Sequence, residues 1–472
     1  MKKEKGSITL FSLIALLLVS AALFALLEGT RLQEMRRFAL LQTESALESA
    51  FANYNGCLWE KYRLLGADGS SMQKIVERSA GGRMGSGMNL LRLVPEDVKL
   101  EEYTRITDGN GNVYIANVAS YMKENFVYEA SKEIYSQYES IKQVLETSQM
   151  DTSNITDALE EMERLESLKQ TRTQDGLVDA KSILESAKYW MELGILELFV
   201  KNVEELSNAK LDYGSGLLER NLLKGKNPVE YTNNWQERML LQQYLLTYMS
   251  SFMDGRENRA LAYELEYLVG KCHRDIDNLK VTITRLLAIR EASNYLCLIS
   301  DPIRVAQAEA MAIFLVGTTA NPMLIETVKI GLLTAWAFGE SVLDVRALLA
   351  GKKVSLLKNE ENWTLELENL SELSNVDRMA KECVLGITYE DYLGILLLLE
   401  KEQNLAMYAM NLQEATIRKN TGNPLFCIDT LITRAKGTVK YSYKPVFPFL
   451  RVIDAEQRWE YAVWANAEYG YD

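Results

Sequence analysis

The chain has 472 residues, 47% of them hydrophobic and 25% charged, with only 7 prolines and a net charge of −13. This length provides for two or three domains with their own cores, and the composition is that of a globular chain. So acidic a surface repels a phosphate backbone, which argues against nucleic acid as a partner. Scarce proline and long segments of 3.6-residue periodicity predict a mainly α fold with a minor β component, an α+β arrangement.

The cysteine and histidine content argues against metal and redox chemistry. Five cysteines stand singly with no C-x-x-C pair, and we interpret them as small buried hydrophobic residues: Cys57, Cys272, Cys297, Cys383 and Cys427. The single histidine, His273, excludes HExxH zinc sites and histidine-rich metal sites. Neither a phosphate-binding loop nor a nucleophile elbow is present. We therefore predict no catalytic motif, no enzyme activity, no metal and no cofactor.

The N-terminus combines a basic tail, residues 1–7, with an uncharged apolar stretch, residues 8–27. At 1.5 Å per residue this stretch spans a hydrocarbon layer of about 30 Å. It is a signal peptide, a membrane anchor or the stem of a pilus subunit. A signal peptide has an apolar region of about 7–15 residues followed by a small-x-small exit site. The longer stretch without such a site favours an uncleaved transmembrane helix.

Orientation follows from the charges on the two sides of the apolar stretch. The number of lysine and arginine residues is the same on both sides, three before the stretch and three after it. The terminal amine on one side, and the acidic Glu28 and Glu34 on the other, favour a cytoplasmic N-terminus. We expect a single-pass protein of the cell membrane with the bulk of the chain extracytoplasmic.

After the apolar stretch, apolar residues continue at 3-4 spacing through residues 28–65, which predicts an amphipathic stem helix continuous with the span. Residues 66–123 begin with a glycine-rich connector and then alternate with period two. The sequence DGNGN (Asp108–Asn112) lies between two such runs, which predicts a β-hairpin turn. An EF-hand calcium loop starting at Asp108 is disfavoured. Such a loop carries glycine at its sixth position and glutamate at its twelfth, whereas this chain has Val113 and Ala119 there.

The remaining chain divides into three regions. Residues 124–228 are acidic and helical, typical of a spacer or partner surface. Residues 229–420 carry the densest helical pattern and predict a core bundle. Within it, Leu324–Gly351 is apolar but interrupted by charges, so we expect a buried helix rather than a second span. Residues 421–472 return to period two and predict C-terminal strands in a mixed segment, which leaves open whether the flanking strands form one sheet.

Charges interleaved in the apolar helices form the one enzyme-like feature of the sequence. The candidates for a buried charge network are Glu264, Arg290, Glu340, Asp344 and Arg346. Glu340 and Asp344 stand at i and i+4 and so share one helical face. Such a pair could serve acid–base or metal chemistry. The favoured interpretation is a buried network of ion pairs with Arg290 and Arg346 that fixes how helices dock.

Several stretches resemble an uncharacterised family of clostridial single-pass proteins, a domain of unknown function. These stretches are KGSITLF (Lys5–Phe11), YELEYLVGK (Tyr263–Lys271), LLAIREASN (Leu286–Asn294), AWAFGESVLDVRALLAGKKV (Ala335–Val354) and GITYEDYLGILLLL (Gly386–Leu399). This resemblance brings no established activity. The N-terminal segment also resembles that of TadE/TadG-type pilin-like proteins, which belong to tight-adherence (Flp) pilus systems.

The second resemblance implies cleavage between Gly6 and Ser7, where a glycine follows basic residues as at prepilin-type processing sites. Pilins place a glutamate at the fifth position after the cut, and here that position is Phe11. The tip pseudopilin of type II secretion systems also lacks this glutamate and carries a large helical insertion within a pilin-like sheet.

These observations lead us to expect a membrane-anchored accessory or minor-pilin-like component of a tight-adherence pilus or related secretion assembly. Its partners would be the lipid bilayer and other pilus or envelope proteins. An anchored adhesion or scaffold protein without pilin character is the first alternative. A membrane-tethered hydrolase is the second.

Overall fold

The structure is a computed structural model that describes residues 4–82, 93–125, 129–147, 195–211, 216–232, 234–317, 321–443 and 461–471, with short pieces at 156–158, 160, 184–189 and 191. The chain divides into two compact units. Unit 1 comprises Met1–Ser120, Glu219–Thr232 and Leu425–Asp472, and unit 2 comprises Tyr121–Leu218 and Asn233–Pro424. Unit 2 is therefore inserted, in two pieces, into the chain of unit 1.

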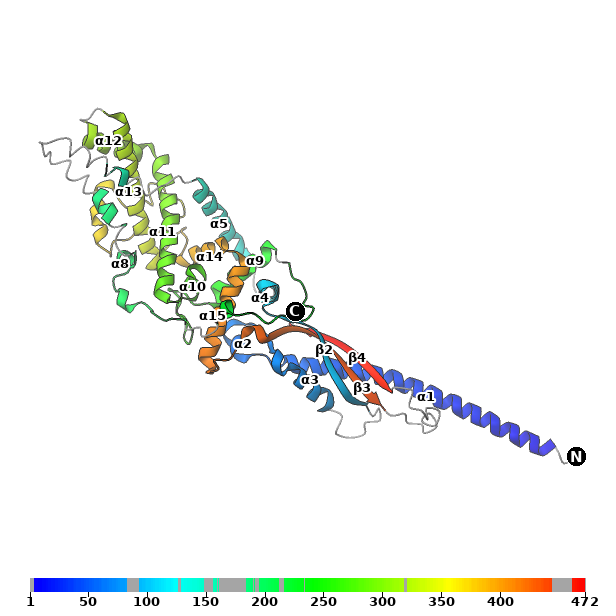
Figure 1. Ribbon diagram of the computed structural model, residues 1–472. Helices are drawn as coiled ribbons and strands as arrows, with labels where there is room; N and C mark the ends of the chain where they lie inside the picture. The colour runs from blue at the N-terminus through cyan, green and yellow to red at the C-terminus, as the bar shows by residue number, and fades with distance from the viewer. Residues whose placement is uncertain are drawn as a thin grey trace. The chain divides into compact units, whose positions relative to one another are not determined.

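Unit 1 is built on α1 (Glu4–Phe51), an uninterrupted helix of 48 residues. Figure 1 shows its first half projecting beyond the strands and its second half lying along them. The second half buries one stripe, formed by Met35, Ala39, Ala46, Leu47 and Ala50. The predicted continuation of the apolar helix into an amphipathic stem is thus observed as far as Phe51. A separate short helix, α2 (Gly56–Tyr62), follows it.

In the described part of unit 1, four antiparallel strands form a sheet: β1 (Ala67–Asp68), β2 (Leu93–Arg105), β3 (Leu431–Tyr443) and β4 (Ala462–Gly470). β3 pairs with all three of the others, and Val98 lies opposite Val439 in its pairing with β2. The inner face of the sheet packs with α1 and α3 (Gly69–Gly82) in one hydrophobic core. In this core the hydroxyls of Thr43 and Tyr441 share a hydrogen bond of 3.1 Å. The strands predicted on either side of the helical body therefore form one sheet.

The β-hairpin expected around DGNGN (Asp108–Asn112) is wrong in its second half. After β2 the chain enters the short 3₁₀ helix η1 (Asp108–Gly111) and then α4 (Asn112–Asn125). The Asp108 carboxylate accepts the backbone N–H groups of Arg105, at 2.7 Å, and Gly225, at 3.0 Å, so it closes a local turn rather than a hairpin. In α4 the buried residues Ile115, Val118 and Met122 follow the 3-4 spacing of one helix face.

Residues 219–232 form a strap along β2 in unit 1. Tyr103 and Lys226 exchange two backbone hydrogen bonds of 2.9 and 3.0 Å, and the Thr104 hydroxyl accepts the N–H of Val229. Arg220 forms an ion pair of 2.6 Å with the buried Asp429. These contacts hold the strap, which joins the two pieces of unit 2 in the chain, against the rest of unit 1.

Unit 2 is helical. Its helices are α5 (Glu129–Thr147), α8 (Ile195–Phe199), α9 (Trp235–Tyr248), α10 (Glu264–Gly270), α11 (Asp275–Ser300), α12 (Pro302–Val316), α13 (Pro322–Leu349), α14 (Tyr389–Leu399) and α15 (Glu402–Thr421), with the 3₁₀ helices η2 (Val203–Glu205), η3 (Leu217–Glu219) and η5 (Leu367–Ser374) near or between them. Side-chain caps set several starts, because Asp301, Asn321 and Thr388 each accept N–H groups of the first turn. The mainly α fold with minor β is confirmed.

Helix α13 is the centre of unit 2 and packs against α11 and α12. Nearly all of its residues from Gly331 to Leu348 are buried, so the prediction of a buried helix at Leu324–Gly351 is confirmed.

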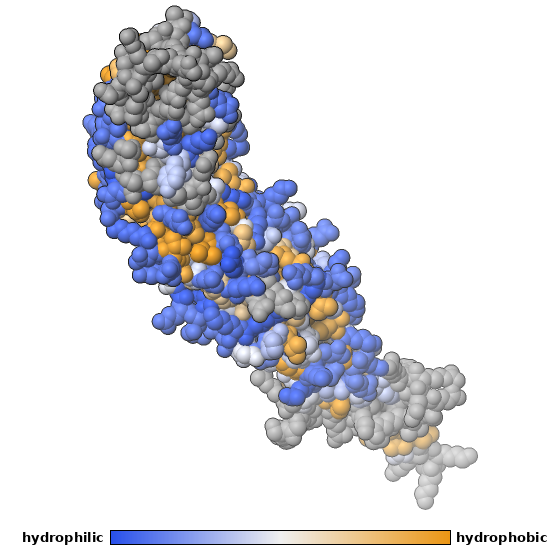
Figure 2. Space-filling view, turned by 60° about the vertical axis from the view of Figure 1, so that its left-hand side comes forward, coloured by the Kyte–Doolittle hydropathy of each residue, from blue (hydrophilic) through white to orange (hydrophobic). Residues whose placement is uncertain are grey.

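On the face drawn in Figure 2 the described surface is mostly hydrophilic, with apolar residues gathered in limited patches. Of the region 124–228 that was predicted to be acidic and helical, most of residues 148–194 lie outside the described part of the chain.

Candidate functional sites: the N-terminal helix and the buried charge clusters

Residues 8–27 of α1 are exposed, apart from the partly exposed Ala15 and Ser20. Within Ile8–Phe51, the most apolar window has a mean hydropathy of 2.8 and is 0% buried. Among the described residues, α1 is the one helix long and apolar enough to cross a membrane, as an anchor or as a signal sequence. Gly6 and Ser7 lie in its first turns, and Phe11 is 74% exposed.

The apolar stretch ends at an ion pair on α1. Glu28 Oε1 lies 2.8 Å from Arg31 Nη1, one turn further along the helix, and Glu28 is buried. From this pair onward α1 has a buried face. The boundary between the exposed half and the packed half therefore coincides with the end of the uncharged sequence.

The central charge cluster of unit 2 is formed by Glu340 and Asp344 of α13, Arg290 of α11 and Lys358. Arg290 Nη2 and Nε lie 2.9 and 3.0 Å from Asp344 Oδ2. Lys358 Nζ lies 2.6 Å from Asp344 Oδ1 and also pairs with Glu340. All four side chains are buried. Two carboxylates and two cations balance one another inside the protein.

Neutral groups complete the hydrogen bonding of the cluster. Glu340 accepts the backbone N–H groups of Thr364, at 3.1 Å, and Leu365, at 2.7 Å. Asn294 donates to Asp344 at 2.8 Å, and the Tyr392 hydroxyl accepts from Arg290 at 3.0 Å. Each of these groups is satisfied by protein atoms, which is the condition under which buried charge is tolerated.

The two carboxyl groups differ in their electrostatics. Burial raises the pKa of Glu340 above its usual value, although Lys358 opposes this shift. Burial acts on Asp344 as well, but Arg290 and Lys358 outweigh it and hold the pKa of that carboxyl below its usual value. The pair is closed to solvent, so its geometry suits helix docking rather than work on a substrate.

Two of the five residues proposed for one network lie elsewhere. Arg346 donates to the backbone carbonyls of Leu198, at 2.9 Å, and Leu373, at 2.8 Å, and burial lowers its pKa to about 10. Glu264 accepts the N–H of Ser250 at 2.9 Å and lies 3.6 Å from Arg259. The five residues are thus spread over three separate clusters.

Lys358 is the member that sequence reasoning missed. It follows α13 in a polar stretch, GKKVSLLKNEENW (Gly351–Trp363), and nothing in the pattern separates it from the neighbouring surface lysines. A buried lysine needs anionic partners, and buried carboxylates need cations. The two carboxylates of α13, Glu340 and Asp344, were therefore an indirect signal that a further cation lies beside them.

A second buried carboxylate, Glu266, ties α10 to two other segments. Its Oε1 accepts the N–H of Phe252, at 2.9 Å, and the hydroxyl of Tyr389, at 2.8 Å. Burial raises the pKa of Glu266 from its usual 4.5 to about 7. Glu266 therefore changes protonation near neutral pH while fully enclosed.

Together these features define an α+β chain with one exposed apolar N-terminal helix, a small antiparallel sheet and a helical unit inserted between the strands. Residues 173–443 match a family of unknown function, DUF5702, and the chain belongs to that family. The match ends at the last residue of β3 and includes the central charge cluster. No curated protein and no solved structure matches the chain.

Proposed function

We propose that the chain is a membrane-anchored, minor-pilin-like component of a tight-adherence pilus or a related secretion assembly. Its N-terminus would be cytoplasmic and both units extracytoplasmic. The observation that carries the proposal is α1, a single helix whose first half is apolar and exposed and whose second half packs on a sheet. A pilin stem has this division because one half lies in the bilayer and the other supports the head.

The order of segments along the chain supports a minor rather than a filament-forming role. Unit 2 is inserted between strands of the unit 1 sheet, as in the tip pseudopilin with its large helical insertion. Phe11 stands where filament-forming pilins carry a glutamate, which can neutralise the terminal amine of a neighbour inside lipid. Without that carboxylate, a position that caps or assembles the filament fits better than one in its body.

An anchored adhesion or scaffold protein is the competing function, and Phe11 is the observation that favours it. The hydrolase hypothesis has lost the carboxylate pair that motivated it, because Glu340 and Asp344 are enclosed by Arg290 and Lys358. Neighbouring genes for a secretion ATPase, a prepilin peptidase and pilins would favour the pilin-like function.

Gene deletion with a matched anchor exchange tests the proposal. We expect deletion to reduce surface filaments, counted by electron microscopy, and the full chain to restore them. In the exchange variant, residues 1–27 are replaced by an unrelated single-pass anchor of equal apolar length. A pilin-like subunit should fail to complement with this anchor, whereas a scaffold needs only attachment to the membrane.

Filament numbers that are unchanged by deletion would overturn the pilin-like function. Full complementation by the exchange variant would replace it with the scaffold function. Membrane fractionation is the control, since both versions must reach the membrane in equal amounts.

A further inference from the structure

The charge cluster on α13 places an amine directly against a carboxylate inside the protein. Lys358 Nζ lies 2.6 Å from Asp344 Oδ1, and the two side chains are 1% and 0% exposed. Reacting atoms in a near-attack arrangement are about 3–3.5 Å apart, and a nitrogen this close to a carboxylate oxygen lies within that range of the carboxyl carbon. The pair therefore has the separation that amide formation requires.

Lys358 is held in this position by the loop that carries it. The Leu356 carbonyl accepts Arg290 Nη1 at 2.8 Å and the Ser293 hydroxyl at 2.7 Å. The Lys358 carbonyl accepts the thiol of Cys297 at 3.2 Å. All three donors belong to α11, so this helix fixes the loop and keeps the amine beside its carboxylate. Such positioning raises the effective concentration of the two reacting groups.

The two oxygens of the Asp344 carboxylate have different partners. Oδ2 accepts Arg290 Nε at 3.0 Å, Arg290 Nη2 at 2.9 Å and Asn294 Nδ2 at 2.8 Å. Oδ1 contacts Lys358 and accepts no hydrogen bond from any other described residue. Donors that converge on one oxygen stabilise the negative charge that develops there when a nucleophile adds to the carbon. Oδ2 therefore suits the oxyanion, and Oδ1 suits the leaving oxygen.

Glu340 is placed to move protons between the amine and the leaving oxygen. It also pairs with Lys358 Nζ, and it lies one helical turn before Asp344 on the same face of α13. The backbone N–H groups of Thr364 and Leu365 fix its carboxylate. Burial raises the pKa of Glu340 above its usual value, which helps this carboxyl group to accept a proton from the amine.

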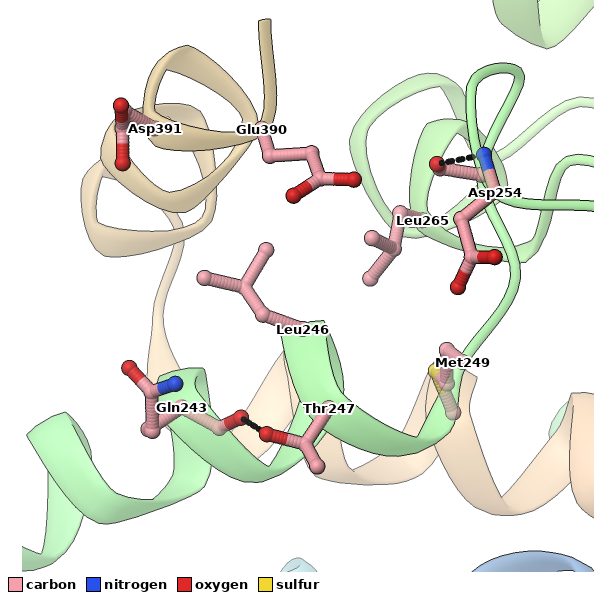
Figure 3. A pocket seen from close by; sticks show the side chains of 9 residues that line it. Gln243, Leu246, Thr247, Met249, Asp254, Leu265, Glu390 and Asp391 are labelled. Carbon is pink, nitrogen blue, oxygen red and sulfur yellow. Dashed lines mark hydrogen bonds between the residues drawn. The ribbon is translucent and has the colours of Figure 1, made fainter. Parts of the chain in front are cut away.

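The cluster is closed to water, which favours the amide because condensation releases a water molecule. Lys358 Nζ lies 5.7 Å from the centroid of the Trp363 ring, and Trp363 is only 4% exposed. The carboxylates at a cleft between α9 and α14 are different. Figure 3 shows Asp254 and Glu390 beside an open space, and both residues are exposed to solvent. Of these two sets of carboxylates, the one on α13 combines enclosure with an adjacent amine.

We propose that Lys358 and Asp344 condense to an intramolecular isopeptide bond, an amide between Nζ and Cγ. One proton passes from Nζ to Glu340 and on to Oδ1. The neutral amine then adds to Cγ, and the electron pair of the C=O bond moves to Oδ2. A second proton follows the same path, the Cγ–Oδ1 bond breaks, and Oδ1 leaves as water. The nitrogen keeps one hydrogen, Glu340 is again a carboxylate, and no other reactant is needed.

The bond joins α13 covalently to the loop that follows it. The ion pairs of the cluster are the arrangement that precedes the bond, and afterwards Glu340 and Arg290 remain as one anion and one cation. The five cysteines are free thiols, so the amide supplies a covalent link that they do not. The proposal does not depend on the pilin-like function, because every group involved lies in unit 2.

Peptide mapping of the folded wild-type chain by mass spectrometry tests the proposal. Trypsin cuts after a free lysine but not after an acylated one. We therefore expect Val354–Arg378 to remain uncut at Lys358 and to be joined to Ile330–Arg346, with a combined mass one water molecule below the sum of the two peptides. Fragment spectra should place the link on Asp344 rather than on Glu340.

Three variants complete the test. Lys358→Met should lack the linked peptides, whereas Lys353→Met, at an exposed position in the same stretch, should keep them. Glu340→Gln should slow linkage in freshly synthesised chains by about a hundredfold or more, because a positioned general acid–base is lost. Near-UV circular dichroism checks that each variant is folded.

A folded wild-type chain that trypsin cuts after Lys358, once the chain is unfolded for digestion, would overturn the proposal. A link on Glu340 would overturn the assignment to Asp344, and an unchanged linkage rate in folded Glu340→Gln would overturn its role as proton carrier. Should a variant fail to fold, the wild-type peptide map still decides whether the bond exists.

Discussion

At the scale of single residues, Lys358 decides what the paired carboxylates of α13 can do. With Lys358 in place, Glu340 and Asp344 are held by an ammonium group that touches both. Without it, the same two carboxylates would be a pair of buried like charges. The helical spacing predicted that Glu340 and Asp344 share a face, but pattern alone cannot place a cation that arrives from the loop after the helix.

Replacing Lys358 by methionine should lower the melting temperature of unit 2 by about 10 °C. Removing one partner of a buried ion pair costs about 3–5 kcal/mol, since the remaining charges lose their compensation. Calorimetry or circular dichroism measures the change. Lys353→Met, at an exposed position in the same stretch, is the control and should melt like the wild type. Equal melting of the two variants would contradict the account of the cluster.

Glu266 should make stability depend on pH. Folded Glu266 keeps its proton up to about pH 7, whereas the unfolded chain releases it near pH 4.5. Between these values the folded state binds more protons, so the free energy of unfolding falls as the pH rises, by about 3 kcal/mol in all. A Glu266→Gln variant lacks this term. Relative to the wild type it should gain stability from pH 5 to pH 8.

Paired thermal melts at several pH values measure the difference between the two proteins. Glu257→Gln, an exposed neighbour, controls for the loss of one negative charge. A stability difference between Glu266→Gln and wild type that stays constant with pH would show that Glu266 titrates as an ordinary glutamate.

At the scale of elements, the long helices were predictable and the strand pairing was not. Apolar periodicity and cap residues such as Asp301 before Pro302 are local signals, and they are sufficient to predict a helix such as α12. β2 instead pairs with β3, which lies beyond the whole of unit 2 in the chain, and no local signal shows such a partner. The sequence DGNGN favours a turn both in the expected β-hairpin and in the observed connection from β2 to α4. In the structure the first residue of this sequence, Asp108, accepts the N–H of Gly225, which comes from a distant segment.

The strap depends on a glycine at position 225. A Cβ atom there would collide with the Asp108 carboxylate and the Tyr103 carbonyl. Gly225→Ala should therefore destabilise unit 1 by about 1–3 kcal/mol and speed amide exchange in the strap, measured by hydrogen exchange. Gly255→Ala is the matched control, because nothing lies within 4 Å of its added Cβ. Equal exchange in the strap of both variants would mean that it is not held by these contacts.

At the scale of the whole molecule, the two halves of α1 differ in their contacts: the first half is exposed and the second half packs in the core of unit 1. The buried core of unit 1 begins at Met35, with the partly buried Leu32 packed against it, and includes none of the described residues before Glu28. This division was predictable, since hydropathy and 3-4 spacing are local properties. The insertion of unit 2 between strands was not, because it depends on which distant strands pair.

Truncation separates the two halves of α1. A chain beginning at Glu28 should remain soluble without detergent and melt like the full protein, because the exposed apolar half adds little to the core. A chain beginning at Ala52 loses core residues including Met35, Leu47 and Phe51, and unit 1 should not fold. Sedimentation and circular dichroism compare the two. A marked loss of stability in the longer chain would contradict this division.

The identity of the mature N-terminus in the membrane fraction tests the central claim most directly. We expect mass spectrometry of the terminal peptide to find Ser7, released by cleavage after Gly6. A Gly6→Leu variant should keep residues 1–6, because the expected cut follows a glycine. Wild-type protein that retains Met1 or Lys2 in the membrane would contradict pilin-like processing and leave α1 as a plain anchor.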